Sequence, residues 1–166
     1  MIKSTLLSAL IACTIALPVN AKDEASIGIQ KLEHVALVTT DYERIVTWYK
    51  DVLDFEVETE WKAPEVVPDM QLNYMVHSSG VRLEIVGGKP AQATSKIVDT
   101  IADDFKIVGI RHFALTVDSV DEAFAYATER GAKILAKPFD YLPLKKRLAF
   151  IQDPDGNAIE FVEILD

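Results

Sequence analysis

An internal repeat constrains the fold of this chain more than any other feature of its sequence. The segment HVALVTTD begins at His34, and the similar segment HFALTVDS begins at His112. Further along, LEIV around Glu84 corresponds to IEFV around Glu160, with two residues fewer between His and Glu in the second copy. Each half of the chain therefore carries one His and one Glu at matching places, which predicts two copies of one structural unit.

Hydrophobic periodicity predicts the same order of elements in both copies, a strand, a helix and then three strands. In the first copy we expect a strand over 32–39, a helix over 41–53 and strands near 55–61, 72–77 and 81–86. In the second copy we expect a strand over 110–117, a helix over 119–130 and strands near 133–137, 147–152 and 158–164. The two βαβββ modules cover about 31–88 and 108–166, and the linker over 87–106 has some helical content around 95–103.

Local signals mark the ends and the buried faces of the two long helices. Asp41 is a candidate N-cap, and Ser119 begins a Ser-x-x-Glu capping box in a helix that stops at Gly131. Trp48 and Tyr49 lie at the face of the first helix that meets the sheet. We therefore expect these two aromatic residues in the core rather than in a substrate pocket.

Alternation along the strands indicates where the repeated polar residues point. Successive side chains face opposite sides of a sheet, so His34 shares a face with the small Ala36, and Glu84 shares a face with Val86. Bulky apolar neighbours such as Leu83 point to the other face, against the helices, and the second copy follows the same pattern. Small side chains beside the polar ones predict an open cleft.

The N-terminal residues 1–21 predict a cleaved secretory signal. Lys3 supplies a positive charge, an apolar run follows, and small residues precede a cleavage point after Ala21. The run is too short to cross a bilayer, which takes about 20 residues as a helix. A lipoprotein signal with lipid on Cys13 is the alternative. Cleavage leaves one domain over 29–166, and we expect this domain in the periplasm.

Composition limits the classes of partner. The chain has 26 acidic and 17 basic residues and a formal net charge of −9, whereas nucleic acids and anionic membranes call for basic surfaces. The single cysteine, Cys13, lies in the signal, so the mature chain has no thiol, which suits an oxidising compartment. We therefore expect a small-molecule substrate, with no nucleic acid and no membrane as partner after signal cleavage.

The segments HVALVTTD, TWYKDVLDF, VRLEIVGG, GIRHFALTVDSVDEA and DPDGNAIEFVEI together resemble the vicinal oxygen chelate superfamily, and more narrowly its small glyoxalase I-like members. The resemblance covers nearly all of the expected mature chain. It implies an α+β fold in which paired βαβββ modules form a curled, barrel-like mixed sheet around a metal cleft. Some relatives build each site from one chain and others from two, so a homodimer is one expectation.

On that resemblance, His34, Glu84, His112 and Glu160 match the two-His, two-Glu ligand set of glyoxalase I. Imidazole and carboxylate ligands suit one divalent ion of Zn, Ni, Co, Mn or Fe, and four protein ligands leave two octahedral positions for two vicinal substrate oxygens. The resemblance also favours Glu160 as the catalytic base. Any one of the four, taken alone, is more typical of a surface polar residue, and only the repeated set indicates a metal site.

Other polar residues carry weaker signals. Lys146 and Arg147 are candidate substrate-binding residues for an anionic substrate arm, or equally part of a solvated basic run. We expect His77, beside a turn, to be exposed and not to bind metal. The DPDGN segment at 153–157 is far shorter than an EF-hand loop, so we expect a hairpin turn rather than a calcium site.

The resemblance leaves the reaction open between three classes. The first is a metal-dependent lyase or isomerase of the glyoxalase I kind. The second is another enzyme of the superfamily, such as an epimerase, an extradiol dioxygenase or a thiol transferase, and the third is a non-catalytic protein that binds a drug or other small molecule. Val38 and Gly88 stand where glyoxalases carry an Arg and often an Asn for glutathione, so glutathione does not carry over with the resemblance.

Overall fold

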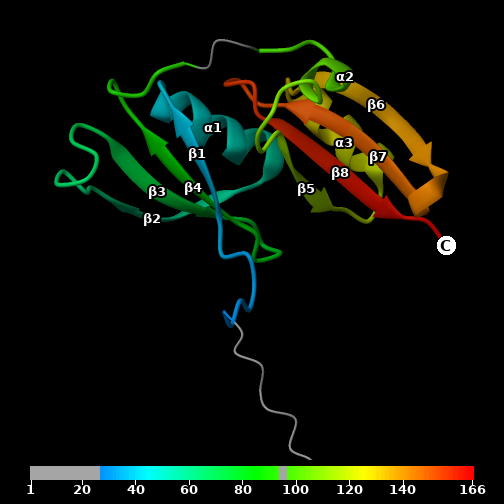
Figure 1. The fold of residues 1–166 in the computed structure, drawn as a ribbon, viewed down its shortest axis with the longest axis horizontal. Helices are drawn as coiled ribbons and strands as arrows, with labels where there is room; N and C mark the ends of the chain where they lie inside the picture. The colour runs from blue at the N-terminus through cyan, green and yellow to red at the C-terminus, as the bar shows by residue number, and fades with distance from the viewer. Residues whose placement is uncertain (1–26, 94–96) are drawn as a thin grey trace, which may run out of the picture. The chain divides into compact units, whose positions relative to one another are not determined.

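The computed structural model describes residues 27–93 and 97–166 (Figure 1). Within them, residues 32–166 form one compact unit. The expected signal over 1–21, with Cys13, lies outside the described residues. In the described part of the chain, no helix is long and apolar enough to cross a membrane.

The unit consists of two βαβββ modules, as the repeat predicts. The first contains β1 (Val35–Thr39), α1 (Tyr42–Leu53), β2 (Glu56–Trp61), β3 (Gln71–Val76) and β4 (Arg82–Gly87). The second contains β5 (His112–Thr116), α3 (Val120–Glu129), β6 (Lys133–Tyr141), the 3-10 turn η1 (Leu142–Leu144), β7 (Lys146–Gln152) and β8 (Ala158–Ile164). A short helix, α2 (Ile101–Asp104), lies in the expected linker.

Each module forms its own four-stranded mixed sheet. The strand orders are β1-β4-β3-β2 and β5-β8-β7-β6, so the first and last strands of each module are parallel neighbours. The remaining neighbours are antiparallel. The sheets curl but do not close into a barrel, and this arrangement confirms the expected α+β fold (Figure 1).

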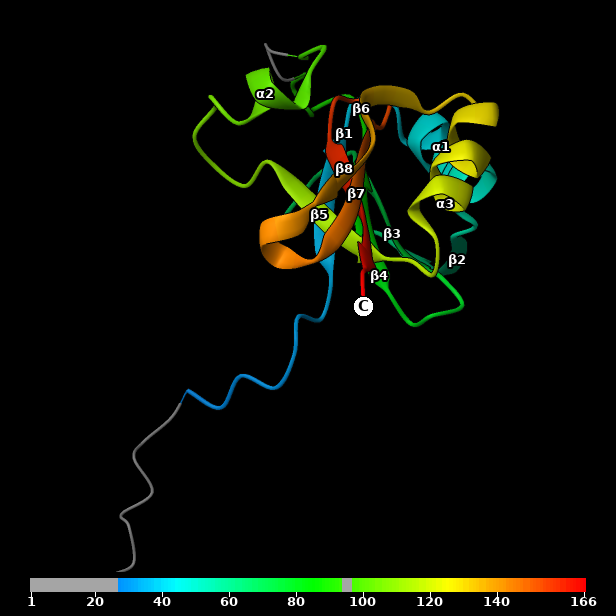
Figure 2. The same cartoon turned by 90° about the vertical axis from the view of Figure 1, so that its right-hand side faces the viewer.

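The two long helices cover one face of the sheets. In Figure 2, α1 and α3 lie together on one side of the strands, and α2 lies on the other side. The core between α1 and its sheet contains Tyr49, Leu83 and Ile85, all at 0% exposure, and Trp48 packs against it. Burial of Tyr49 and the packing of Trp48 confirm the expected core position of both aromatic residues.

The helix caps follow the sequence signals. The Asp41 side chain accepts a hydrogen bond from Arg44 N at 3.2 Å, and the Ser119 side chain accepts one from Glu122 N at 3.3 Å. Each cap satisfies a backbone N–H that has no partner inside its helix.

Strand β6 continues beyond its expected end at 137 and includes Pro138. Proline cannot donate a ladder hydrogen bond, so a strand normally avoids it except at an edge or a bulge. Both conditions hold here, because β6 is the edge strand of its sheet and its register against β7 shifts between Ala136 and Phe139. Local pattern alone ended the strand too early.

The DPDGN segment forms the turn between the antiparallel strands β7 and β8, as expected. It also joins the two modules. The Tyr49 hydroxyl of α1 donates a hydrogen bond to Asp153 Oδ2 at 3.1 Å, and Arg44 forms an ion pair with Asp155. These contacts fix the helix of the first module against the last hairpin of the second.

Candidate functional site

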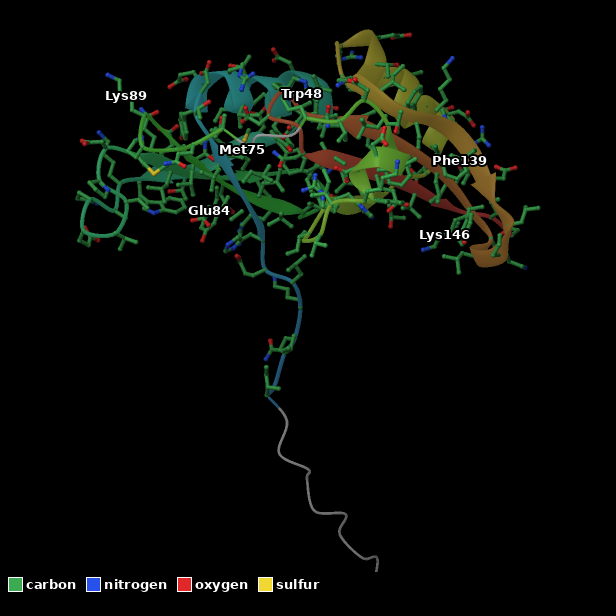
Figure 3. All side chains as sticks on the ribbon, turned by 45° about the horizontal axis from the view of Figure 1, so that its top comes forward. Trp48, Met75, Glu84, Lys89, Phe139 and Lys146 are labelled. Carbon is green, nitrogen blue, oxygen red and sulfur yellow. The ribbon has the colours of Figure 1, made fainter. Side chains whose placement is uncertain are left out.

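The four repeated polar residues lie on the sheet faces that the long helices leave uncovered. On β1, Leu37 is buried against the helix, whereas Ala36 and Val38 are exposed. Figure 3 shows Glu84 and Trp48 on opposite sides of the first sheet, which follows from the alternation along the strands. We call this uncovered side of each sheet its site face.

The first module brings His34 and Glu84 together. The parallel register of β1 and β4 places Ala36 beside Glu84, so the preceding residue on the same face, His34, lies next to the same carboxylate. His34 Nε2 is 3.3 Å from Glu84 Oε2, and their side chains are 30% and 19% exposed. Two residues far apart in the sequence thus form a polar pair that solvent can reach.

The second module repeats this pair with nearly the same geometry. The parallel register of β5 and β8 places Ala114 beside Glu160. His112 Nε2 is 3.2 Å from Glu160 Oε2, and their side chains are 30% and 14% exposed. The repeat seen in the sequence is therefore also a repeat of the site geometry.

The separation within each pair fits two ligands of one metal ion. Protein nitrogen and oxygen donors lie about 2.1 Å from ions such as Zn²⁺. Two such donors are about 3.0 Å apart at a right angle and about 3.4 Å apart at a tetrahedral angle, by the same bond length. The observed 3.3 Å and 3.2 Å lie between these values, so His34 with Glu84, and His112 with Glu160, are each suited to hold an ion from two sides.

The described part of the chain does not gather all four residues into one cluster. Among residues 27–93 and 97–166, no group of three or more His, Cys, Asp or Glu side chains is placed to hold a metal. The structure instead contains two half-sites, which we define as His34 with Glu84 and His112 with Glu160.

Sequence reasoning missed Glu33, which orients the first histidine. Its carboxylate accepts a hydrogen bond from His34 Nδ1, so Nε2 is the nitrogen that faces Glu84. The hydrogen bond from His34, followed by the one from Arg82, lowers the pKa of the Glu33 carboxyl. A carboxylate on the far nitrogen of a histidine is a common support for metal binding, because it fixes the ring and its tautomer. The adjacent Glu-His pair in the sequence was the available signal.

The second half-site lacks this support and has a different neighbour. Arg111 stands where Glu33 stands in the first module, and its guanidinium pairs with Asp104 of α2 at 2.5 Å. Asp104 is completely buried. Within the described residues, Nδ1 of His112 is buried without a hydrogen-bond partner. The two half-sites therefore share their ligand geometry but differ in what surrounds it.

The other polar candidates lie away from the half-sites. Arg147 binds Asp121 of α3 and Asp140 of β6, at 2.7 and 2.6 Å, whereas Lys146 begins β7 on its site face. The paired carboxylates of Asp121, followed by Asp140, raise the pKa of Arg147. The substrate-binding role of these two residues stays a prediction.

His77 bonds to the turn that follows it. Its Nδ1 lies 2.8 Å from Ser79 Oγ and accepts the Ser79 backbone N–H at 3.1 Å. The ring is half-buried rather than exposed and lies 5.7 Å from the Phe55 ring. These contacts give His77 a local role at the β3–β4 turn.

Comparisons with known proteins agree with this architecture. The family model described as the glyoxalase/bleomycin resistance protein/dioxygenase superfamily matches residues 31–161. The chain is 26% identical to the protein YaeR of Escherichia coli over 148 residues, which cover 82% of this chain and 98% of YaeR. It is 30% identical to YwkD of Bacillus subtilis over 139 residues, which cover 81% of this chain and 98% of YwkD.

Solved structures with the same fold include a glyoxalase family protein from Enterococcus faecalis. That protein is 26% identical to this chain, with a TM-score of 0.64 over 81% of this chain and 98% of the other. Glyoxalase I from Zea mays also has a TM-score of 0.64, at 19% identity, over 82% of this chain and 45% of the maize chain. At that identity, the maize enzyme supports the fold alone.

Proposed function

The chain belongs to the glyoxalase/bleomycin resistance protein/dioxygenase superfamily, and on that premise we propose that it is a divalent-metal-dependent lyase or isomerase of the glyoxalase I kind. Its substrate would present two vicinal oxygens to the metal. The observation that carries the proposal is the duplicated half-site, His34 with Glu84 and His112 with Glu160, each with donors spaced as two ligands of one ion.

The donor set suits one ion of Zn, Ni, Co, Mn or Fe. Two imidazole nitrogens and two carboxylates are ligands that these ions accept, and an octahedral ion would keep two positions for the substrate. When bound, such an ion stabilises negative charge that develops on both substrate oxygens. Glu33 holds the His34 ring with Nε2 toward the site, so the chain prepares this ligand before any ion arrives.

We infer that a second copy of the chain completes each site. One half-site supplies only two ligands, and the described residues contain no larger cluster. Exposed apolar side chains lie beside both half-sites, among them Val38 on β1 at 59% exposure and Ile110 before β5 at 94%. Exposed apolar residues around an incomplete site favour pairing of the first half-site with the second half-site of another copy.

Glu160 is the proposed base, and its surroundings support this role. A histidine bound to metal through Nε2 has no basic nitrogen toward the substrate, so among the four proposed ligands only the glutamates can take the substrate proton. Glu160 lies among the apolar Leu148, Phe150 and Val162. Glu84 instead follows Arg82 by two residues on β4, and Arg82 forms ion pairs with Glu33 and Glu58. Apolar neighbours limit the access of water to a proton that Glu160 would carry, so we propose Glu160 rather than Glu84 as the base.

Two glutamine variants test the proposal. Glu160→Gln keeps an oxygen ligand but no longer accepts a proton, so we expect it to retain much of the metal and to lose about 10² to 10⁴ in rate. The readout is exchange of the substrate C–H with deuterated solvent, beside metal content by elemental analysis. If Glu84→Gln is the variant that stops exchange, the two roles are reversed, and if neither variant slows exchange, proton transfer is the wrong reaction.

Alanine variants test the metal site independently of any substrate. We expect His34→Ala, Glu84→Ala, His112→Ala and Glu160→Ala each to lower the affinity for Zn²⁺. His77→Ala is the matched control, because the His77 ring hydrogen-bonds to its own turn and belongs to neither half-site, and it should bind as the wild type does. Equal metal content in all of these proteins would rule out the site.

A further inference from the structure

The duplication extends beyond the ligands to an aromatic residue beside each glutamate. Tyr74 of β3 lies directly across from Glu84 on β4, and Phe150 of β7 lies directly across from Glu160 on β8. In both modules the aromatic residue is ten positions before the glutamate. Cross-strand partners share a face of the sheet, so both rings lie on the site face.

A second aromatic residue is duplicated on the outer strand of each sheet. Trp61 of β2 pairs with Leu72, and Phe139 of β6 pairs with Leu148. The two leucines are two positions before Tyr74 and Phe150, so Trp61 and Phe139 also occupy equivalent places on the site face. Trp61 and Phe139 are also 78 positions apart, the same offset as His34 and His112.

The rings form a continuous row from the outer strand to the histidine in both modules. In the first, the Trp61 and Tyr74 rings are 4.7 Å apart, and Tyr74 is 5.5 Å from the His34 ring. Aromatic pairs at 4.5–7 Å attract one another beyond simple burial, so such a row is a defined surface. Trp61 and Tyr74 are only half-buried, so the row is accessible rather than part of the core.

The second row has the same order and gains a ring from the linker. The Phe139 and Phe150 rings are stacked at 6.5 Å, and Phe150 is 5.6 Å from the His112 ring. Phe105, at the end of α2, is also 5.6 Å from the His112 ring and is 58% exposed. Helix α2 is fixed on this face, because Ile101 packs against the cluster that contains Phe150.

The arginines beside the half-sites are already paired. Arg82 binds Glu33 and Glu58, the latter at 2.7 Å, and its guanidinium lies 5.4 Å from the Tyr74 ring. Arg111 binds the buried Asp104. Carboxylates already balance the charge of both guanidiniums, so these arginines attract an anionic substrate arm less than unpaired ones would. The aromatic rings beside the proposed metal favour an apolar group.

We propose that the site takes substrates in which an aryl group is bonded to an atom that carries one of the two vicinal oxygens. This inference rests on the proposed function, since the metal would hold the oxygens while the aromatic rows hold the ring. The rows begin beside both histidines and lie on the same face as the proposed ligands, so a chelated substrate would lie against them. A flat ring can stack on Trp61 and Tyr74 or lie against Phe139 and Phe105, whereas a short aliphatic substrate would leave these rings uncovered.

Hydroxamates provide matched probes, because they chelate a metal through two vicinal oxygens and differ only in the attached group. The full mature chain loaded with Zn²⁺ is titrated by calorimetry with benzohydroxamate, cyclohexanecarbohydroxamate and acetohydroxamate. We expect benzohydroxamate to bind at least about 10-fold more tightly than acetohydroxamate, from the burial and stacking of a phenyl ring. It should also bind more tightly than the cyclohexane compound, which is similar in volume but cannot stack.

Two tryptophan variants test which residue causes the preference for an aryl group. Trp61→Leu should bring the phenyl-to-methyl affinity ratio down several-fold while acetohydroxamate binding stays unchanged. Trp48→Leu, in the other tryptophan of the chain and on the helix side, is the control and should leave the ratio unchanged. Circular dichroism of both variants checks that they are folded.

The outcomes separate this inference from the proposed function. If all three hydroxamates bind with similar affinity, the metal site stands and the aryl preference is wrong. Equal binding of the phenyl and cyclohexyl compounds also overturns it, because an apolar pocket without stacking would then be sufficient. If none of them binds the Zn²⁺-loaded chain, the proposed function fails, and the inference that rests on it fails too.

Discussion

The buried contact between Tyr49 and Asp153 joins the two modules, and Tyr49→Phe removes only its hydroxyl. The hydroxyl donates to Asp153 Oδ2 at 3.1 Å, and both residues are buried, at 0% and 3% exposure. Burial, followed by the charge of Asp153, raises the pKa of the Tyr49 hydroxyl well above its usual range. The tyrosine therefore remains a donor at any ordinary pH.

The expected loss of stability in Tyr49→Phe depends on the hydrogen bonds that Asp153 retains. A hydrogen bond to a charged group contributes about 1.5–3 kcal/mol net. In the variant, Asp153 still accepts from Asp155 N at 3.0 Å, from Asn157 N at 2.8 Å and from Asn157 Nδ2 at 2.8 Å, so the carboxylate is not left unpaired. We therefore expect the lower end, about 1.5 kcal/mol, which corresponds to a fall in Tm of about 3–6 °C.

Differential scanning calorimetry and urea unfolding at pH 7 measure this loss. Tyr126→Phe is the matched control, because the Tyr126 hydroxyl donates to Asp54 Oδ1 at 2.8 Å, also between the modules but at a site that is 38% exposed. In Tyr126→Phe, water replaces the hydrogen bond to Asp54, so we expect the free energy of unfolding to change by no more than about 0.5 kcal/mol. Equal losses in the two variants, or no loss in Tyr49→Phe, would refute the claim that burial makes the Tyr49 contact strong.

Three further predictions concern other parts of the chain. Mass spectrometry of the native protein from the periplasmic fraction should find a chain that begins at Lys22. An intact N-terminus or an attached lipid would contradict this. Burial, followed by the charge of Glu60, raises the pKa of Tyr42 to about 12, so the unfolded chain loses this proton near pH 10 while the native chain keeps it. The free energy of unfolding should therefore fall by up to about 2.7 kcal/mol between pH 10 and 12, and Tyr42→Phe should lack that part of the fall. Gly87→Ala places a Cβ 2.8 Å from Thr39 Cγ2 and from Tyr42 Cβ, so we expect it to cost about 1–3 kcal/mol in urea unfolding, and an unchanged midpoint would show that the β4 end can move.

Much of the fold was available from local sequence patterns. The positions of the helices and strands follow from hydrophobic periodicity, and the caps at Asp41 and Ser119 follow from single residues. The failures occurred where a tertiary position overrides a local signal. Pro138 is accepted in β6 because that strand lies at an edge, and no local pattern says which strand will be at an edge.

The repeat in the sequence by itself determined the two βαβββ modules and selected His34, Glu84, His112 and Glu160, because duplicated residue types and alternation along strands are local properties. Only the tertiary structure decided which residues meet. The parallel registers of β1 with β4 and of β5 with β8 pair each histidine with the glutamate of its own module. Cross-strand register likewise placed the aromatic residues of neighbouring strands beside the glutamates. Burial of the apolar face of each strand against the helices sets these registers, and that packing is a tertiary property.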